Sequence, residues 1–97
     1  FEDIINLSDN NLQVLLRNVD MNILVVALKG TPEELRERVR SNLSQRGRER
    51  LVEEMQMLGP VALSQVQEAQ RQICAEARNL AERGEINLES GSEEYVE

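Results

Sequence analysis

Aromatic residues are almost missing from this 97-residue chain, which contains one Phe, one Tyr and no Trp. Phe1 and Tyr95 stand near opposite ends, so the core has to be built from Leu, Val, Ile, Met and Ala. Apart from the β-branched residues among them, these favour helices, and the small Ala side chain lets helix axes approach closely. At this length we expect one small domain.

Histidine is absent, and Cys74 is the only cysteine. The chain can therefore form neither an internal disulfide nor a zinc site of Cys and His ligands. A lone Cys on a helix is usually a small core residue, and no His is available to deprotonate it for nucleophilic attack. We expect a reducing compartment, no metal, no cofactor and no enzymatic activity.

Long apolar runs are also missing, because the longest one covers only residues 23–28. A membrane-spanning helix needs about 20 apolar residues, so we expect no direct membrane insertion. No signal peptide is visible, and the first residue is not Met, which suggests a piece of a longer chain. The sequence predicts a soluble, cytoplasmic domain.

Charge is abundant and unevenly distributed. The net charge of −7 argues against nucleic acid as the main partner. The balance is −3 over residues 1–28, +3 over residues 29–50 and −7 over residues 51–97. Such segregation bears on partner choice and encounter rate rather than on the fold.

Capping residues, Gly and Pro divide the first half of the chain into helices. Thr31 as cap, Pro32 at the first helical position and Glu34 in a capping box predict a helix over residues 32–42. Gly30 would end the preceding helix in a left-handed conformation. The apolar run 23–28 could be a buried strand, but no second strand is available to pair with it, so we interpret it as a buried helix. Upstream, either Ser8 or Asp9 can cap a helix that carries four apolar residues. These are Leu12, Leu15, Leu16 and Val19.

The second half begins after the Gly59–Pro60 break. A helix over residues 63–83 is predicted by one apolar stripe, and Gly84 ends it. The stripe consists of Val66, Ala69, Ile73, Ala77 and Leu80. We expect Ile86 and Leu88 to fold back onto the core, and residues 89–97 to form a loose acidic tail.

Residues 44–58 lie between two breaks and should form one helix with Ser44 as its cap. At about 100° per residue its two faces separate. The apolar arc that should face the core carries Leu51, Val52, Met55 and Leu58. The outward arc carries Arg46, Glu49, Arg50, Glu53, Glu54 and Met57.

The outward arc is basic in its first turns and acidic later, which opposes the helix macrodipole. Its ordinary interpretation is a solvated helix face in which Arg50 pairs with Glu53 or Glu54. A charge order that works against helix stability is a mild indication of external use.

Seven short segments together resemble the C-terminal domain of the flagellar motor switch protein FliG. They are ALKG at 27–30, LRE at 35–37, NLSQR at 42–46, EEM at 53–55, LGPV at 58–61, VQEAQ at 66–70 and GEI at 84–86. The opening FEDI at 1–4 resembles the end of that family's hinge motif, and EYV at 94–96 resembles its tail. The likeness covers essentially the whole chain in order and spacing.

The resemblance implies an all-α fold, a compact bundle of about six helices in an armadillo-like superhelical family, over residues 1–88. It implies a rotor component for motility and chemotaxis, in the cytoplasm at the inner membrane face of the flagellar basal body. The implied partners are the cytoplasmic loop of the stator subunit MotA, neighbouring copies in the rotor ring, and FliM and FliF through parts of the full-length chain. The family's ridge charges map onto Lys29, Arg46, Glu53 and Glu54, and Arg50 adds to the same face.

One position departs from the family, because Ala62 stands where its members often have Arg. Arg48 and Arg50 are possible partial substitutes for that charge.

Two alternatives remain. An enzyme that uses Glu53 and Glu54 as a carboxylate pair is disfavoured, because adjacent helical residues point about 100° apart. A generic helical adaptor, or a weak nucleic-acid binder through the Arg-rich middle, is permitted by the charge, but no aromatic residues interleave to stack bases.

Overall fold

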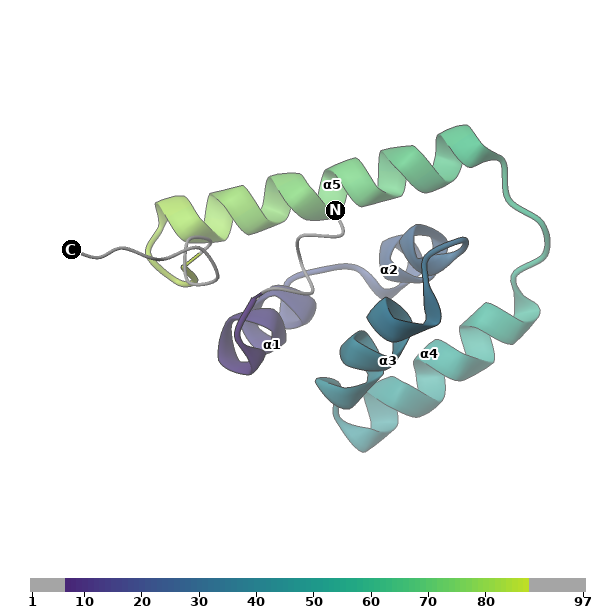
Figure 1. Cartoon of the computed structure of the whole chain (residues 1–97), viewed down its shortest axis with the longest axis horizontal. Coiled ribbons are helices and arrows are strands. Elements are labelled where there is room, and N and C mark those ends of the chain that lie inside the picture. Colours follow the sequence, from purple (N-terminus) through teal and green to yellow (C-terminus); the bar gives the residue numbers. More distant parts are fainter. Residues whose placement is uncertain (1–6, 88–97) are drawn as a thin grey trace.

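The computed structural model describes residues 7–87, which form five α-helices and no strand (Figure 1). Their bounds are α1 Asp9–Arg17, α2 Met21–Leu28, α3 Glu33–Ser41, α4 Gln45–Met57 and α5 Leu63–Glu82. The all-α prediction is confirmed, with five helices in the described range against the six or so that the resemblance implied. The segments 1–4 and 89–97 and the residue Leu88, on which expectations were placed, lie outside this range.

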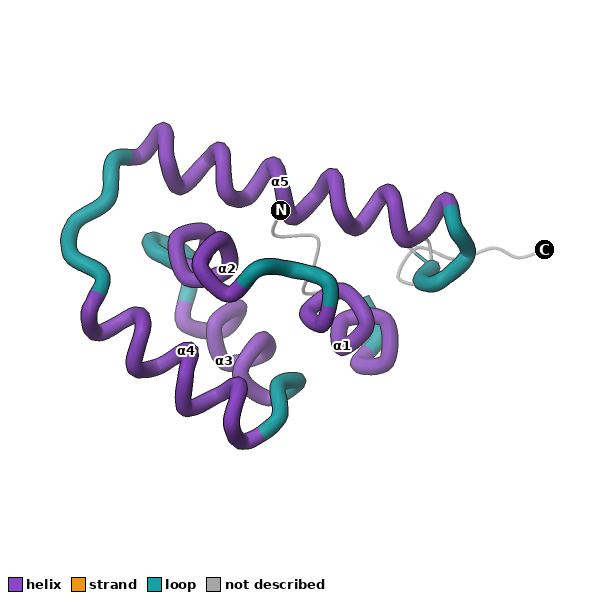
Figure 2. The backbone as a smooth tube through the Cα atoms, turned by 180° about the vertical axis from the view of Figure 1, so that it is seen from behind, coloured by secondary structure: helices purple, strands orange, loops and turns teal. Residues whose placement is uncertain are grey.

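The helix α2 lies at the centre of the molecule, between α5 on one side and α4 on the other (Figures 1 and 2). Leu24, Val25, Ala27 and Leu28 of α2 are all buried. The strand interpretation of residues 23–28 is therefore wrong, and the buried-helix interpretation is confirmed. None of the helices in the described part of the chain is long and apolar enough to cross a membrane.

The long helix α5 covers α2 with one apolar stripe, as predicted. The five residues of the stripe, Val66, Ala69, Ile73, Ala77 and Leu80, are all buried. Gly84 follows the helix with φ +79°, a left-handed conformation that Gly adopts without steric cost. Ile86 folds back and is buried, whereas Cys74 on the flank of α5 is only half-buried.

The turn between α2 and α3 combines one confirmed prediction with one error. Gly30 has φ +85° and follows Lys29 in a type II turn closed by Thr31 N–H donating to Leu28 C=O at 3.2 Å. Thr31 does not cap α3. Its buried hydroxyl donates to the same Leu28 carbonyl at 2.7 Å, since the end of α2 offers an acceptor. Pro32, predicted at the first helical position, is instead the N-cap residue of α3, and α3 has no side-chain cap.

Two helices begin with the predicted serine caps. The Ser8 hydroxyl accepts from Asn11 N–H at 3.2 Å at the start of α1. The Ser44 hydroxyl accepts from Gly47 N–H at 3.1 Å at the start of α4. The start of α4, the helix with the charged outward arc, is therefore determined by a local cap that the sequence predicts.

Two arginines of α3 form ion pairs with glutamates of the same helix. Arg40 and Arg36 both bond to the carboxylate of Glu33, and these bonds, the one from Arg40 foremost, lower the pKa of Glu33 below its usual value. Arg40 also contacts Glu37. The bond to Glu33 and then the bond to Glu37 raise the pKa of Arg40 above its usual value.

We expect Arg40→Gln to raise the pKa of Glu33 toward its ordinary value, as measured by NMR titration of the side-chain carboxyl. A lowered acid pKa means that the pairing stabilises the fold above the unfolded pKa and is lost as the pH falls through the folded one. A Glu33 pKa that the substitution leaves unchanged would show that Arg40 does not act on it in solution.

Candidate protein-binding ridge

The helix α4 is attached to the rest of the domain by a narrow apolar seam. It packs mainly against α2 and α3, and Leu51 is its one buried residue, with none of its surface exposed. Met55 and the following Leu58 are half-buried and pack against the core cluster. Val52 was predicted to face the core but is 42% exposed, because no other helix covers the flank of α4 on which it lies.

The opposite face of α4 carries the predicted charges. We call Arg46, Arg50, Glu53 and Glu54 the ridge. The first three are exposed and Glu54 is half-buried. Arg50 Nε lies 3.7 Å from Glu54 Oε2, the predicted (i, i+4) pair, and an exposed pair of this kind contributes about 0–1 kcal/mol.

Two ridge residues are not used internally. In the described part of the chain, neither Arg46 nor Glu53 makes a side-chain hydrogen bond or ion pair, and no such contact is found for Lys29 either. Their charges are therefore available to another molecule without breaking an internal contact.

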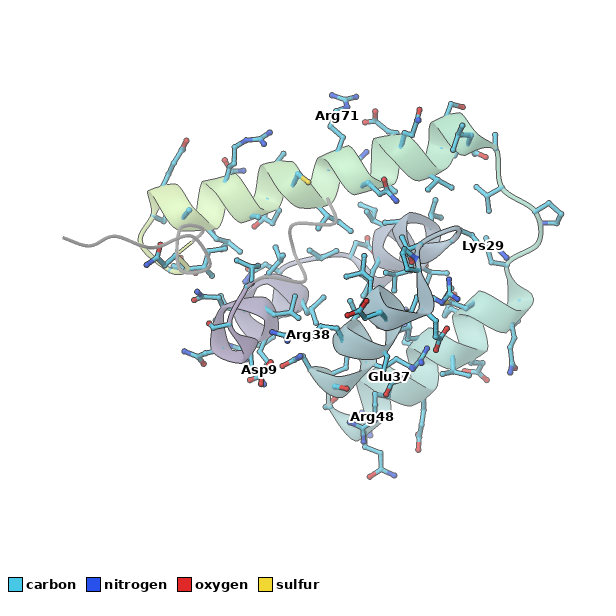
Figure 3. The ribbon with its side chains drawn as sticks, viewed as in Figure 1. Asp9, Lys29, Glu37, Arg38, Arg48 and Arg71 are labelled. Carbon is cyan, nitrogen blue, oxygen red and sulfur yellow. The ribbon has the colours of Figure 1, made fainter. Side chains whose placement is uncertain are left out.

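Lys29 stands apart from the start of the ridge. It occupies the second position of the type II turn after α2 and lies on the side of the molecule where α4 ends and leads toward α5 (Figure 3). Arg46 is in the first turn of α4, a helix of 13 residues or about 20 Å. The structure thus brings Arg46, Arg50, Glu53 and Glu54 together on one helix and places Lys29 toward the other end of it.

Other arginines of the basic middle do not join the ridge. Arg48 Nη1 donates to Leu43 C=O at 3.0 Å, so Arg48 folds over the α3–α4 turn and cannot substitute for the missing ridge Arg. Arg38 Nη2 donates to Leu7 C=O at 2.5 Å and lies 3.0 Å from Asp9 Oδ1. Arg38 on α3 and Asp9 on α1 are labelled in Figure 3. With Arg36 and Arg40 paired on α3, the middle of the chain is not one continuous basic face.

Ala62 is exposed and is the N-cap residue of α5, where its backbone N–H donates to Gln65 Oε1 at 3.1 Å. We expect Ala62→Arg to fold normally, with a change in unfolding free energy of less than about 0.5 kcal/mol, because the new side chain points into solvent. Urea unfolding measures this. Loss of folding would mean that residue 62 needs its small side chain for packing, which would contradict its place beside the exposed ridge.

A metal or carboxylate-pair site is not formed by the ridge. Glu54 turns toward Arg50, and Glu53 has no acidic partner. Across residues 7–87, no three acidic or Cys side chains gather in a way that could hold a metal ion. The arrangement fits recognition of a charged surface.

Comparisons with known proteins point in one direction. The sequence pattern of the FliG C-terminal domain matches residues 1–88. Over 96 residues the chain is 44% identical to the flagellar motor switch protein FliG of Thermotoga maritima, and over 97 residues 41% identical to that of Pseudomonas aeruginosa. These alignments cover 99% of this chain but only 29% of each relative.

Solved structures agree with the sequence comparison. A crystal structure of FliG residues 116–343 from H. pylori superposes with a TM-score of 0.86 at 37% identity, over 90% of this chain and 38% of that one. The full-length FliG of Aquifex aeolicus gives a TM-score of 0.80 at 40% identity, over 86% of this chain and 26% of that one. The chain spans less than a third of the length of the curated FliG relatives that it matches in sequence.

Proposed function

The chain belongs to the FliG C-terminal domain family, and from that we propose that it is the stator-facing domain of a flagellar motor switch protein. In this proposal the ridge and Lys29 interact electrostatically with the stator, receive torque from it and set the direction of rotation. The domain covers residues 1–88 and works at the cytoplasmic face of the inner membrane in the basal body. It catalyses no reaction.

The observation that carries the proposal is the set of exposed charges that the fold does not use. Arg46 and Glu53 protrude from α4 without internal partners, whereas the arginines of α3 are consumed by Glu33, Glu37 and Asp9. A charge order that opposes the macrodipole costs the helix some stability, which an external role accounts for. The nucleic-acid alternative is not favoured, because most of its arginines are already paired.

A torque interface requires contacts that form and break rapidly. Exposed charges raise the association rate by steering, without the deep energy minimum that a dry apolar patch would create. We propose the cytoplasmic loop of the stator subunit MotA as the partner. Neighbouring copies in the rotor ring are further partners, and FliM and FliF are reached through other parts of the full-length protein. Reversal of rotation would follow from reorientation of this domain, which presents the same ridge differently.

Binding of the purified chain to a MotA loop peptide, compared with binding to duplex DNA, tests the proposal. We expect affinity for the peptide that weakens as salt rises from about 0.01 M to 1 M, since the screening length falls from about 30 Å to 3 Å. Arg46→Glu should weaken it, and Arg78→Glu on the exposed face of α5 is the matched control. Preference for DNA, or equal effects of both variants, would refute the assignment of the ridge.

A further inference from the structure

An apolar surface runs from the last residue of α4 to the first residue of α5. Residues 57–63, with the sequence MLGPVAL, contain no charged and no hydrogen-bonding side chain. None of the seven is buried, and Met57 and Leu63 at the two ends are 73% and 70% exposed. A Cβ atom added at Gly59 would meet no neighbouring atom within 4 Å, so the space beside the middle of the segment is open. We call residues 57–63 the apolar strip.

The strip differs from the apolar run of α2. In residues 23–28 most side chains are buried in the core, whereas in the strip only Leu58 and Val61 are even half-buried. Single exposed apolar residues are common on protein surfaces, but a continuous exposed apolar stretch marks an interaction site. The strip therefore points to a partner that covers it.

The strip begins on the ridge face of α4. Met57 lies about 20° around the helix from Arg46, and Glu53 and Glu54 are its neighbours one turn earlier. A long helical side chain is directed toward the N-terminus of its helix, which carries Met57 toward these two carboxylates. A molecule that contacts the acidic half of the ridge therefore reaches Met57 as well.

Charges of opposite sign lie on both sides of the strip. Glu53 and Glu54 precede it on α4. Lys29, which makes no ion pair with another described residue, lies on the side of the molecule where α4 leads toward α5 (Figure 3). A complementary segment has apolar side chains with a basic group at one end and an acidic group at the other.

We propose that the apolar strip, with Met57 as its anchor, is part of the surface that binds the partner of the ridge. This proposal rests on the proposed function, in which that partner is the stator loop. The occupant is a segment of the loop that presents a basic group to Glu53 and Glu54 and an apolar side chain to Met57.

The strip supplies what the charges of the ridge lack. Exposed charges attract a partner, but they share one field and are screened, so they do not fix its register. An apolar contact has a short range, and the flexible Met side chain adapts to partner side chains of different shape. A strip of seven residues thus adds register without the deep energy minimum of a large dry patch.

Binding of the 97-residue chain to the MotA loop peptide tests the proposal. Met57→Gln replaces the apolar side chain with a polar one of similar helix propensity and leaves the charge unchanged. We expect about tenfold weaker binding, the loss that follows when one apolar side chain is no longer buried, and Met57→Leu should bind like the unsubstituted chain. Since apolar contacts are not screened, this loss should persist at about 1 M salt, where the effect of Arg46→Glu should fade.

Val52→Gln is the matched control, because it makes the same apolar-to-polar change at an exposed position about 140° around α4 from Met57. Binding that Arg46→Glu weakens, but that Met57→Gln changes no more than Val52→Gln does, would overturn the strip alone. Peptide binding that is absent, or that Arg46→Glu leaves unchanged, would overturn the proposed function and the strip with it.

The methyl groups of the three Met residues report where the peptide lies. In NMR spectra of chain that is isotope-labelled at these methyl groups, the peptide should shift the signal of Met57 and leave that of Met21, at the start of α2, in place. An unchanged Met57 signal in chain that binds the peptide would refute the anchor. A Met57 signal that moves with protein concentration in the absence of peptide would show contact between copies and would refute the stator segment as the occupant.

Discussion

Truncation of Leu51 to Ala is expected to lower the free energy of unfolding by about 2–5 kcal/mol, the range for large-to-small changes at fully buried positions. Leu51 has no exposed surface and is the one buried residue of α4, so its loss leaves a cavity where this helix meets the core. The measurement is the midpoint and slope of urea unfolding, followed by circular dichroism.

Val52→Ala is the matched control, since it truncates an apolar side chain at the next position of the same helix. Val52 is 42% exposed, so we expect a loss well below that of Leu51→Ala. Glu53→Ala should change stability by less than about 0.5 kcal/mol. Equal losses at positions 51 and 53 would show that the inner and outer faces of α4 are reversed.

Local signals in the sequence were sufficient for most of the fold. Serine caps at Ser8 and Ser44 act through neighbouring backbone N–H groups, and the left-handed Gly30 and Gly84 act on their own turns. The stripe on α5 repeats over 20 residues, long enough to define which face is buried. These interactions lie within a few residues of one another, so the sequence alone predicts them.

The errors arose where the outcome depends on distant elements. Val52 fits the apolar arc of α4, but whether that flank is covered depends on where α2 and α3 end. The hydroxyl of Thr31 could either accept from a backbone N–H at the start of α3 or donate to a carbonyl at the end of α2. In the structure it donates to the carbonyl of Leu28 in α2. Arg48 was expected to substitute partly for the charge missing at Ala62, but its long side chain, close to the start of α4, folds over the preceding turn and donates to Leu43 C=O.

The sequence predicted which charged residues share one face of α4, but not which of the neighbouring charges are paired within the domain. Spacing put Arg46, Arg50, Glu53 and Glu54 on one side of α4, and the structure has them there. Spacing could not tell that the α3 arginines are paired within the domain, which is what distinguishes the ridge from the rest of the basic middle. Nor could it give the position of Lys29 relative to α4.

Reversal of Lys29 and Arg46 together to Glu is expected to abolish or severely reduce motility while folding and rotor assembly stay intact. The double change shifts the local charge by four units, and a like-charge contact at an interface costs several kcal/mol. Single reversals should have mild effects, because neighbouring charges share the field and exposed charges are screened over about 8 Å at physiological salt. Swimming speed of cells that carry the full-length protein is the readout.

The matched control reverses Arg71 and Arg78 to Glu, which makes the same four-unit change on the exposed face of α5. Expression level and ring assembly are measured for both double variants. Normal swimming of the Lys29 and Arg46 variant would mean that the ridge is an ordinary solvated helix face. Equal defects in both double variants would assign the effect to total charge.

Rotation of tethered cells in which the opposing stator acids are also reversed to Lys tests the central claim most directly. If torque passes through complementary charges, the stator change alone should impair rotation, and its combination with the Lys29 and Arg46 reversals should restore rotation, because the pairing of signs matters. A rotor defect that no reversal of stator charge relieves would contradict an electrostatic interface at this ridge and would assign Lys29 and Arg46 a role inside the rotor.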